Sequence, residues 1–405
     1  MKALRALSSF LLTVVLSTLL YGCRESMEAV VTEVKFDLNT VKSIHDSGLI
    51  THVSLISLQQ PEVTIGKISK IEVLDSLLYL LDESSKSVHI FTDAGRYVNT
   101  ISARGHGAGE YINIDDIFAD GENKTINILS RQNGKVYVYN AQGNKQTRIL
   151  QLPKHFFKMS RTADGYIGYM GNFTEDTSKP YNYWLLDKQM RIKNCFGQID
   201  KNLESRVSLN FQPFSSFKTN TDILTELSRD VLTLKNGDSN PTTAFALDFG
   251  PYNMLKLRSK DFTDDKALLK IKNTSIVNPT MCQETDDYLL SLVYVQGQPI
   301  IAAYNKQKDQ TYALGLDAYT GDLLMSFGDI AGMNENHIYT VVDAESVHDI
   351  WKGKNEFNDF EAEHPRQVRN MRKLFRNVDP MGNPFLAIYS FRKPHSSKPA
   401  IANRQ

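Results

Sequence analysis

Apolar and polar positions alternate along this chain in a unit that recurs five times. Each unit is a short apolar strand, a polar turn and a second strand, which is typical of a tight β-hairpin. Units start at positions 88, 136, 183 and 231, separated by 48, 47 and 48 residues. A period just under 50 residues predicts the four-stranded blades of a β-propeller. The first strands of the five units are Val88–Phe91, Val136–Tyr139, Tyr183–Leu186, Val231–Leu234 and Ile301–Tyr304.

Two more strands are expected before each hairpin. In the first unit they are Ile68–Val73 and Leu77–Leu81, separated by a turn at Asp75-Ser76. A single blade cannot bury both of its faces, so blades must stack around an axis and share apolar surfaces. The alternative is a β-sandwich with accidental spacing, which the three near-equal steps disfavour.

A sixth blade is expected between Ala331 and Phe391. His337–Asp343 and Pro384–Phe391 have the composition of two of its strands. Thr51–Leu58 alternates apolar and polar residues and has no hairpin partner nearby. We therefore expect this N-terminal strand to complete the sixth blade and close the ring, which removes exposed sheet edges.

Two segments interrupt the repeat. Met254–Lys272 accounts for the longer step of 70 residues between the fourth and fifth units, and its mixture of Leu, Lys and Asp predicts a partly helical insertion. Residues from about 345 to 378 carry apolar side chains on one helical stripe. We interpret both as decorations packed against the propeller. The alternative is a lid or a docking surface.

The first 22 residues have the three parts of a secretory signal. Lys2 and Arg5 form the positive region, and the apolar stretch Leu7–Leu20 follows. The stretch ends in Leu-Tyr-Gly-Cys, which resembles the bacterial lipobox and predicts a lipid on Cys23. The alternatives are an ordinary signal peptide cut elsewhere and an uncleaved anchor, but about 14 apolar residues are too few to span a bilayer.

These features predict the organisation of the whole chain. A signal peptide (1–22) precedes a lipidated tether (23–33), an all-β six-bladed propeller (34–395) and a polar tail (396–405). Several acyl chains on one Cys would make the membrane anchor effectively permanent. The acidic tether resembles the export signal of Bacteroides-type lipoproteins. An outer-membrane lipoprotein is therefore predicted, on the periplasmic face or the cell surface.

Composition excludes some functions. Lys plus Arg and Asp plus Glu both number 46, so the chain has no basic footprint for nucleic acid. Cys195 and Cys282, the Cys residues besides Cys23, lie in apolar strand-like sequence. We interpret them as buried thiols, because two isolated Cys residues do not form a disulfide framework.

Six short stretches spread over the mature chain carry a family resemblance: 36–38, 52–58, 66–71, 104–111, 248–250 and 383–384. Together they resemble the six-bladed β-propeller lipoproteins of Bacteroidetes, an NHL-like group. The resemblance implies that Phe36–Leu38 is a short N-terminal strand and that His52–Leu58 closes the ring. Ala108 stands where Pro is more usual in the Gly-rich loop. The family implies a fold and an envelope location, but no reaction or catalytic residues.

The Gly-rich loop Arg104–Tyr111 is the most distinctive local motif. A dinucleotide-binding loop needs a following helix, whereas a strand is expected here at Ile112–Phe118. We interpret the loop as a crossover between blades in which glycines permit close backbone approach. The alternative places Arg104, His106, Glu110 and Tyr111 at the mouth of the propeller as ligand-binding residues.

No catalytic or metal motif stands out. The nine His residues show no metal-ligand spacing, and no Gly-x-Ser-x-Gly elbow occurs. The carboxylate pairs, including Asp115-Asp116, fit solvated turns or strand ends better than an acid/base dyad. We predict no catalytic residues, metal or cofactor.

Asp75-Ser76-Leu77 resembles the short O-glycosylation acceptor of Bacteroides exported proteins. Ser76 is therefore a candidate modification site. The motif is short enough to occur by chance.

The leading functional hypothesis is a non-catalytic binding or scaffold module for a peptide, glycan or protein partner. Rigid blades that carry variable loops suit this role. One alternative is a metal-dependent hydrolase, lactonase or lyase that uses the propeller axis. Another is a sensor partnered with a membrane receptor.

Overall fold

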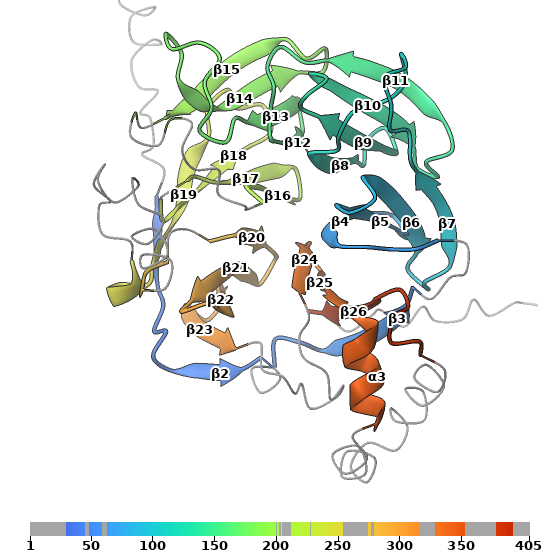
Figure 1. The fold of residues 1–405 in the computed structure, drawn as a ribbon. Helices are drawn as coiled ribbons and strands as arrows, with labels where there is room; N and C mark the ends of the chain where they lie inside the picture. The colour runs from blue at the N-terminus through green and yellow to red at the C-terminus, as the bar shows by residue number, and fades with distance from the viewer. Residues whose placement is uncertain are drawn as a thin grey trace, which may run out of the picture.

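The structure is a ring of six β-sheets around a central axis (Figure 1), and the four blade strands of each sheet are antiparallel. It is a computed structural model that describes residues 30–44, 48–58, 63–199, 201, 204, 212–226, 228–253, 274–276, 279–315, 329–352 and 378–391. Each sheet contains four blade strands, which we count from the first at the axis to the fourth at the outside. The predicted six-bladed β-propeller is therefore confirmed.

The first three blades follow one another without interruption in the sequence. Blade 1 contains β4 (Ile68–Leu74), β5 (Leu77–Asp82), β6 (Ser87–Thr92) and β7 (Tyr97–Ile101). Blade 2 contains β8 (Asp116–Asp120), β9 (Thr125–Ser130), β10 (Lys135–Asn140) and β11 (Gln146–Gln151). Blade 3 contains β12 (Lys158–Thr162), β13 (Gly165–Tyr169), β14 (Tyr181–Asp187) and β15 (Ile192–Gln198).

The last three blades each gain a strand from the N-terminal part of the chain. Blade 4 contains β16 (Phe214–Phe217), β17 (Asn220–Leu224), β18 (Asp230–Leu234), β19 (Thr242–Asp248) and β1 (Thr32–Lys35). Blade 5 contains β20 (Met281–Glu284), β21 (Tyr288–Val295), β22 (Gln298–Asn305), β23 (Gln310–Gly315) and β2 (Val41–Ser43). Blade 6 contains β24 (Asp329–Met333), β25 (His337–Val342), β26 (Phe385–Ser390) and β3 (His52–Ser57).

The ring closes as the alternation of residues 51–58 predicted. β3 pairs antiparallel with β26, from Ser57 opposite Phe385 to His52 opposite Ser390. A strand from each end of the chain thus completes blade 6. The five predicted hairpins are the third and fourth strands of blades 1 to 5.

Two local predictions need correction. Phe36–Leu38 is not a strand: the strand β1 ends at Lys35, and Phe36 and Leu38 are buried beyond it. β1 also begins at Thr32, inside the segment expected to be tether. β8 begins at Asp116 rather than at Ile112, because residues 112–115 belong to the crossover from blade 1.

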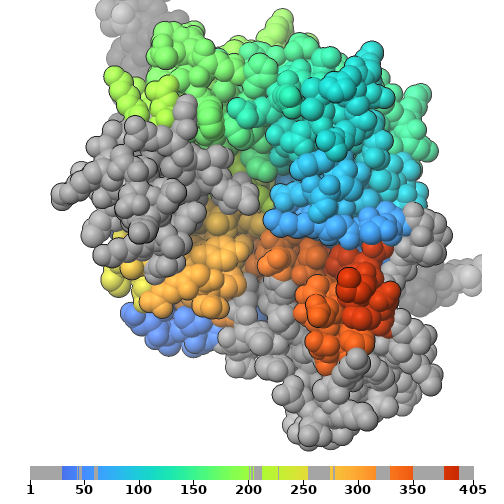
Figure 2. Space-filling model, viewed as in Figure 1, coloured from blue at the N-terminus to red at the C-terminus, as the bar shows by residue number. Residues whose placement is uncertain are grey.

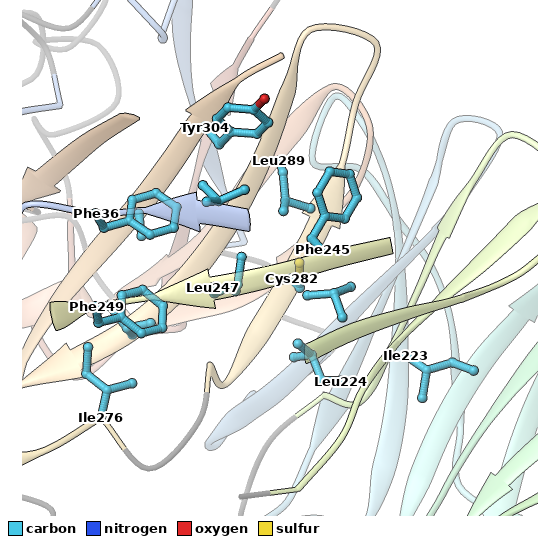
Figure 3. Packing of buried hydrophobic residues seen from close by; sticks show 14 of the residues in the cluster. Phe36, Ile223, Leu224, Phe245, Leu247, Phe249, Ile276, Cys282, Leu289 and Tyr304 are labelled. Carbon is cyan, nitrogen blue, oxygen red and sulfur yellow. The ribbon is translucent and has the colours of Figure 1, made fainter. Parts of the chain in front are cut away.

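The apolar core is divided among the junctions between blades. One cluster, for example, joins blades 1 and 2 through Ile90, Ile117, Ile128 and Tyr137. The cluster that joins blades 3, 4 and 5 also takes in Phe36 from the N-terminal segment, which lies near Leu247 and Phe249 in Figure 3. Each blade thus buries its apolar faces against the neighbouring blades, as stacked blades require.

The two ends of the ring differ in their connections. At one end of the ring, short turns of two to seven residues join the first strand of a blade to the second and the third strand to the fourth. We call this the turn end. At the opposite end, which we call the crossover end, the chain passes from the second strand of a blade to the third. It also passes there from the fourth strand to the first strand of the next blade. Six connections of more than ten residues leave the crossover end: 102–115, 170–180, 199–213, 249–280, 316–328 and 343–384.

The predicted helical decoration begins in the last of these connections. The helix α3 (Ala344–Lys352) lies beside blade 6 (Figures 1 and 2) and is capped by Asp343, which accepts a hydrogen bond from the Ser346 amide at 2.6 Å. A short 3₁₀ turn, η2 (Gly250–Tyr252), follows β19. The predicted insertion 254–272, residues 353–377, the signal peptide, Cys23 and the tail lie outside the described residues.

Among the residues that the structure describes, no helix is both long enough and apolar enough to span a bilayer.

Candidate functional site

The propeller axis has a cavity at each end. The crossover-end cavity has a volume of about 490 Å³ and includes Lys86 and Asp115 from two crossover-end connections. The turn-end cavity has a volume of about 470 Å³ and includes Gly121 and Asn336 from two turns. Gln212 and Met281 line both cavities, so the two meet near the middle of the axis.

The crossover-end cavity is lined mainly by polar and charged side chains. Leu81, Ile114 and Leu292 add a smaller apolar part. Tyr294, on the same cavity, keeps 43% of its surface exposed although it is a large aromatic residue. Such a cavity suits a polar ligand that can also contact an aromatic ring.

A buried ionic cluster lies between the inner strands of blades 1 and 2. The Lys70 ammonium is 2.9 Å from Asp116 Oδ1 and 3.0 Å from Glu72 Oε1, and it donates to the Ile117 carbonyl at 2.7 Å. The second Asp116 oxygen accepts the Met159 amide of blade 3 at 3.0 Å. Three inner strands are therefore tied together by one buried carboxylate.

The cluster sets the protonation state of its members. Burial alone would lower the pKa of Lys70, but attraction to Asp116 and Glu72 raises it above the usual value. Burial and, to a smaller extent, the nearby Asp116 carboxylate raise the pKa of Glu72, although the attraction of Lys70 opposes the shift. Lys70 therefore stays charged.

Two other ammonium groups of the crossover-end cavity are less engaged. Lys158 Nζ is 3.4 Å from the Asp115 carbonyl and 3.9 Å from Asp116. Lys86 forms no ion pair with any residue in the described ranges. Burial raises the pKa of the neighbouring Asp115 carboxyl. Lys158 and Lys86 can therefore offer donors to an acceptor group on a ligand.

The polar side chains that line the turn-end cavity are mostly neutral. Ser160, Ser216 and Gln283 belong to three different inner strands. The Ser215 hydroxyl is buried there without a hydrogen-bond partner. Arg161 also lines this cavity, but Asp120 at 3.1 Å and Glu122 already engage its guanidinium.

The Gly-rich loop lies in the connection 102–115 at the junction of blades 1 and 2, where Gln146 of β11 donates a hydrogen bond to the Gly109 carbonyl at 2.9 Å. Arg104, His106 and Glu110 are exposed, and none of them lines either axial cavity. The Glu110 carboxylate accepts the Gly107 amide at 2.8 Å, so it closes the loop on itself. Ligand binding by these residues stays a prediction.

Tyr111 differs from the other three loop residues because it is fully buried. Its hydroxyl accepts the Ala103 amide at 3.0 Å, and its ring packs edge-on against Tyr137 at 5.8 Å. The Tyr137 hydroxyl in turn donates to the Glu110 carbonyl at 2.6 Å. Tyr111 thus holds the crossover against blade 2.

Other candidates from the sequence can also be placed. Ser76 lies in an exposed two-residue turn between β4 and β5. Both thiols are free, with Cys282 buried and Cys195 half-buried. Across the described ranges, no three His, Cys, Asp or Glu side chains are grouped so that they could hold a metal ion.

The axial ionic cluster is the feature that sequence reasoning missed. The sequence predicts Asp115-Asp116 at a solvated turn or a strand end. Asp116 does begin the strand β8, but it is only 1% exposed. The available signal was Lys70 and Glu72 within an otherwise apolar inner strand. Their pairing across blades could not be predicted, because it depends on ring geometry rather than on local sequence.

Comparison with solved structures supports the fold. A protein from Bacteroides fragilis that is thought to be exported has a TM-score of 0.71 at 17% identity, and the match covers 90% of this chain and 100% of that one. A member of the DUF4221 family from Bacteroides vulgatus has a TM-score of 0.47 at 10% identity, with 84% and 96% covered. The first likeness shows a shared fold, and the second is too weak to carry an argument.

Family membership rests on the sequence. No match was found among curated proteins. The model of a family described as a domain of unknown function, DUF4934, matches residues 30–390, which include every described blade strand. The chain therefore belongs to the DUF4934 family.

Proposed function

We propose that this protein is a non-catalytic binding module of the cell envelope, which holds a peptide, glycan or protein partner at the crossover end of its propeller. One observation carries the proposal. The cavity with the less engaged ammonium groups opens at the end from which all connections of more than ten residues leave. Variable loops around a rigid scaffold are where binding function concentrates.

The ionic cluster of Lys70, Glu72 and Asp116 supports a binding function better than a catalytic one. A lysine that acts as a base or nucleophile needs a lowered pKa, whereas the ion pairs of Lys70 raise its pKa. Its ammonium is also occupied by Asp116, Glu72 and a backbone carbonyl. We therefore assign the cluster to holding the inner strands together.

The envelope location rests on the N-terminal sequence. The lipobox-like end of the leader, Leu-Tyr-Gly-Cys, supports an outer-membrane lipoprotein with its lipid on Cys23, and the NHL-like assignment rests on the family resemblance of the propeller sequence. The exported Bacteroides fragilis protein of the same fold agrees with secretion. Metabolic labelling with a palmitate analogue should mark the wild type and not a Cys23→Ser variant.

Two surface features extend the proposal. Arg104, His106 and Glu110 would widen the binding surface outward from the cavity, since they are exposed in the connection 102–115, which also supplies Asp115 to the cavity. Ser76 would carry an O-linked glycan, since its turn is exposed at the opposite end. Loss of a mass increment in a Ser76→Ala variant would test the modification.

Arrays of defined peptides and glycans, probed with the detergent-solubilised full chain, test the binding function. Tyr294→Ala and Lys158→Met should weaken any retained interaction at least tenfold, because both side chains line the crossover-end cavity. Ser215→Ala in the turn-end cavity is the matched control and should have no effect. Loss of binding by the control alone would contradict the assignment.

A further inference from the structure

We propose that the ligand of the crossover-end cavity is an acidic glycan, whose carboxylate is held by Lys86, Arg131 and Lys158. The inference rests on the binding function proposed above and deepens it, because it names the chemical class of the partner.

The three cations come from three successive blades at the crossover end. Lys86 lies in the connection between β5 and β6 of blade 1, and Arg131 lies in the equivalent connection between β9 and β10 of blade 2. Lys158 is the first residue of β12 in blade 3. Lys86 and Lys158 line the cavity, and the Arg131 amide donates at 2.8 Å to Asp115 Oδ2, which is also on the cavity. The three side chains therefore belong to one side of the ring.

The Arg131 guanidinium is held by aromatic rings and has no acidic partner. Its Cζ lies 3.7 Å from the centroid of the Phe157 ring and 5.3 Å from that of the Phe173 ring. Its Nε is buried without a hydrogen-bond partner, and no carboxylate in the described ranges forms an ion pair with the group. A guanidinium fixed in this way keeps its donors in a planar fork, which matches the two oxygens of a carboxylate.

The nearby carboxylates outside this group are engaged by other cations. Glu83, on the cavity, pairs with Lys67 at 3.3 Å. Glu72 and Asp116 share the Lys70 ammonium at 3.0 and 2.9 Å. Two cations therefore face three carboxylates here.

The three proposed cations face only one further carboxylate, Asp115. Burial raises the pKa of Asp115, although the Arg131 amide and the charges of Arg131 and Lys158 act against this shift. Both charges are therefore close to Asp115, and Lys86 pairs with no residue in the described ranges. With the pairs above, five cations stand against four carboxylates, which leaves one positive charge for a ligand.

The lining of the cavity favours a sugar over a peptide. The side chains of Ser69 and Asn113 form no hydrogen bond within the described part of the chain, so both can bind sugar hydroxyls. Leu81 and Leu292 are only 4% and 1% exposed, so they offer little of the apolar surface that anchors peptide side chains. The exposed Tyr294 ring can pack against the C–H face of a sugar.

Binding of the detergent-solubilised full chain to immobilised probes tests the ligand class. The probes are tetrasaccharides of galacturonate, glucuronate and mannuronate, the methyl ester of each, and tetra-glutamate and tetra-aspartate peptides. We expect the chain to bind at least one acidic tetrasaccharide. Its methyl ester should bind roughly tenfold more weakly or worse, because the ester keeps the sugar skeleton but loses the charge-assisted hydrogen bonds.

Substitutions of the cations test their role. Lys86→Met should weaken binding of the acid roughly tenfold and leave binding of its methyl ester unchanged. Lys86 has no ion-pair partner in the described ranges, so the variant should fold. Arg131→Met should have the same effect on binding. Lys124→Met is the matched control, because it removes the same charge from an exposed pair with Asp75 at the turn end, and it should change neither probe.

The outcomes separate the ligand class from the binding function. Equal binding of an acid and its ester, or retention of only neutral glycans or peptides, would overturn the acidic glycan. The proposed binding function would still stand if Tyr294→Ala weakened that interaction. An unchanged ratio of acid to ester binding in both Lys86→Met and Arg131→Met would overturn the assignment of the cations. If no peptide or glycan of any class is retained, the binding function itself fails.

Discussion

The Lys70 ammonium of blade 1 lies 2.9 Å from the Asp116 carboxylate of blade 2, and both side chains are buried at the propeller axis. The side chains are 12% and 1% exposed, so solvent screens their attraction weakly. Glu72 shares the same ammonium at 3.0 Å. One lysine therefore balances two carboxylates where the inner strands converge.

Removal of this lysine should destabilise the ring strongly. Lys70→Met leaves Glu72 without its counter-charge and leaves the buried Asp116 with only Lys158, at 3.9 Å. Breaking a buried pair on one side costs about 3–5 kcal/mol. Urea unfolding followed by circular dichroism measures the loss. Lys67→Met is the control, because its pair with Glu83 is solvent-exposed and should contribute less than about 1 kcal/mol. Equal losses in the two variants would contradict the role assigned to the cluster.

Ring closure should be sensitive to one glycine. Gly95 has φ +78°, and a Cβ there would lie 2.5 Å from Ile56 Cγ2 in the closing strand β3. Gly95→Ala should lower the free energy of unfolding by about 2–4 kcal/mol, from left-handed strain and overpacking combined.

The matched control for that substitution is Gly237, in the equivalent turn of blade 4. It has φ +85°, but no atom lies within 4 Å of its Cβ position. Gly237→Ala should therefore cost only the strain, about 1 kcal/mol. If the two glycines respond alike in urea unfolding, the closing strand is not packed against Gly95 as described.

Much of the fold could be predicted because the hairpin turns repeat. Gly95 and Gly143 occupy the same turn in blades 1 and 2 with φ +78° and +68°, and the period of 48 residues follows from them. In blade 3 the equivalent position is Met190, with φ +62°, so the turn survives where its sequence signal is lost. Position in the repeat, rather than residue type alone, made that hairpin predictable.

The axial site could not be predicted in the same way. Lys70, Asp116 and Lys158 belong to three blades, and their proximity follows from the closed ring. Tyr111 shows the same limit, because the sequence left both a crossover and a ligand-binding role open for its loop and did not predict that its hydroxyl is buried against the Ala103 amide. Local sequence predicts strands and turns, but it carries little information on which side chains meet around an axis.

Stability should fall as pH rises through neutrality because of Asp222. This carboxylate is 2% exposed, its Oδ2 has no hydrogen-bond partner, and burial raises its pKa to about 7. Below its unfolded pKa near 4 the group is neutral in both states, and between pH 4 and 7 the folded state binds the extra proton. The folded state therefore loses stability over this window, by up to about 4 kcal/mol in total.

Asp222→Asn removes the titration and should flatten this dependence. Relative to wild type, the variant should gain about 2–3 kcal/mol between pH 5 and pH 8 in urea unfolding. Asp82→Asn is the control, because its effect on stability should change with pH in the opposite direction. Burial alone would raise the pKa of Asp82, but the amide donors of Gly66, Ser84 and Ser85 outweigh burial and lower this pKa. That variant should lose more stability at pH 8 than at pH 3. A wild-type stability that rises steadily from pH 5 to 8, with no relative gain for Asp222→Asn, would contradict the assignment.

Site-specific photo-crosslinking in cells tests the central claim most directly. A photoreactive amino acid replaces Tyr294 at the crossover-end cavity in one full-length variant and Ser216 at the turn-end cavity in another. We predict a discrete adduct of defined mass from position 294 that Lys158→Met abolishes, and none from position 216. Adducts from position 216 alone, or adducts from position 294 that persist unchanged in Lys158→Met, would contradict a binding site at the crossover end.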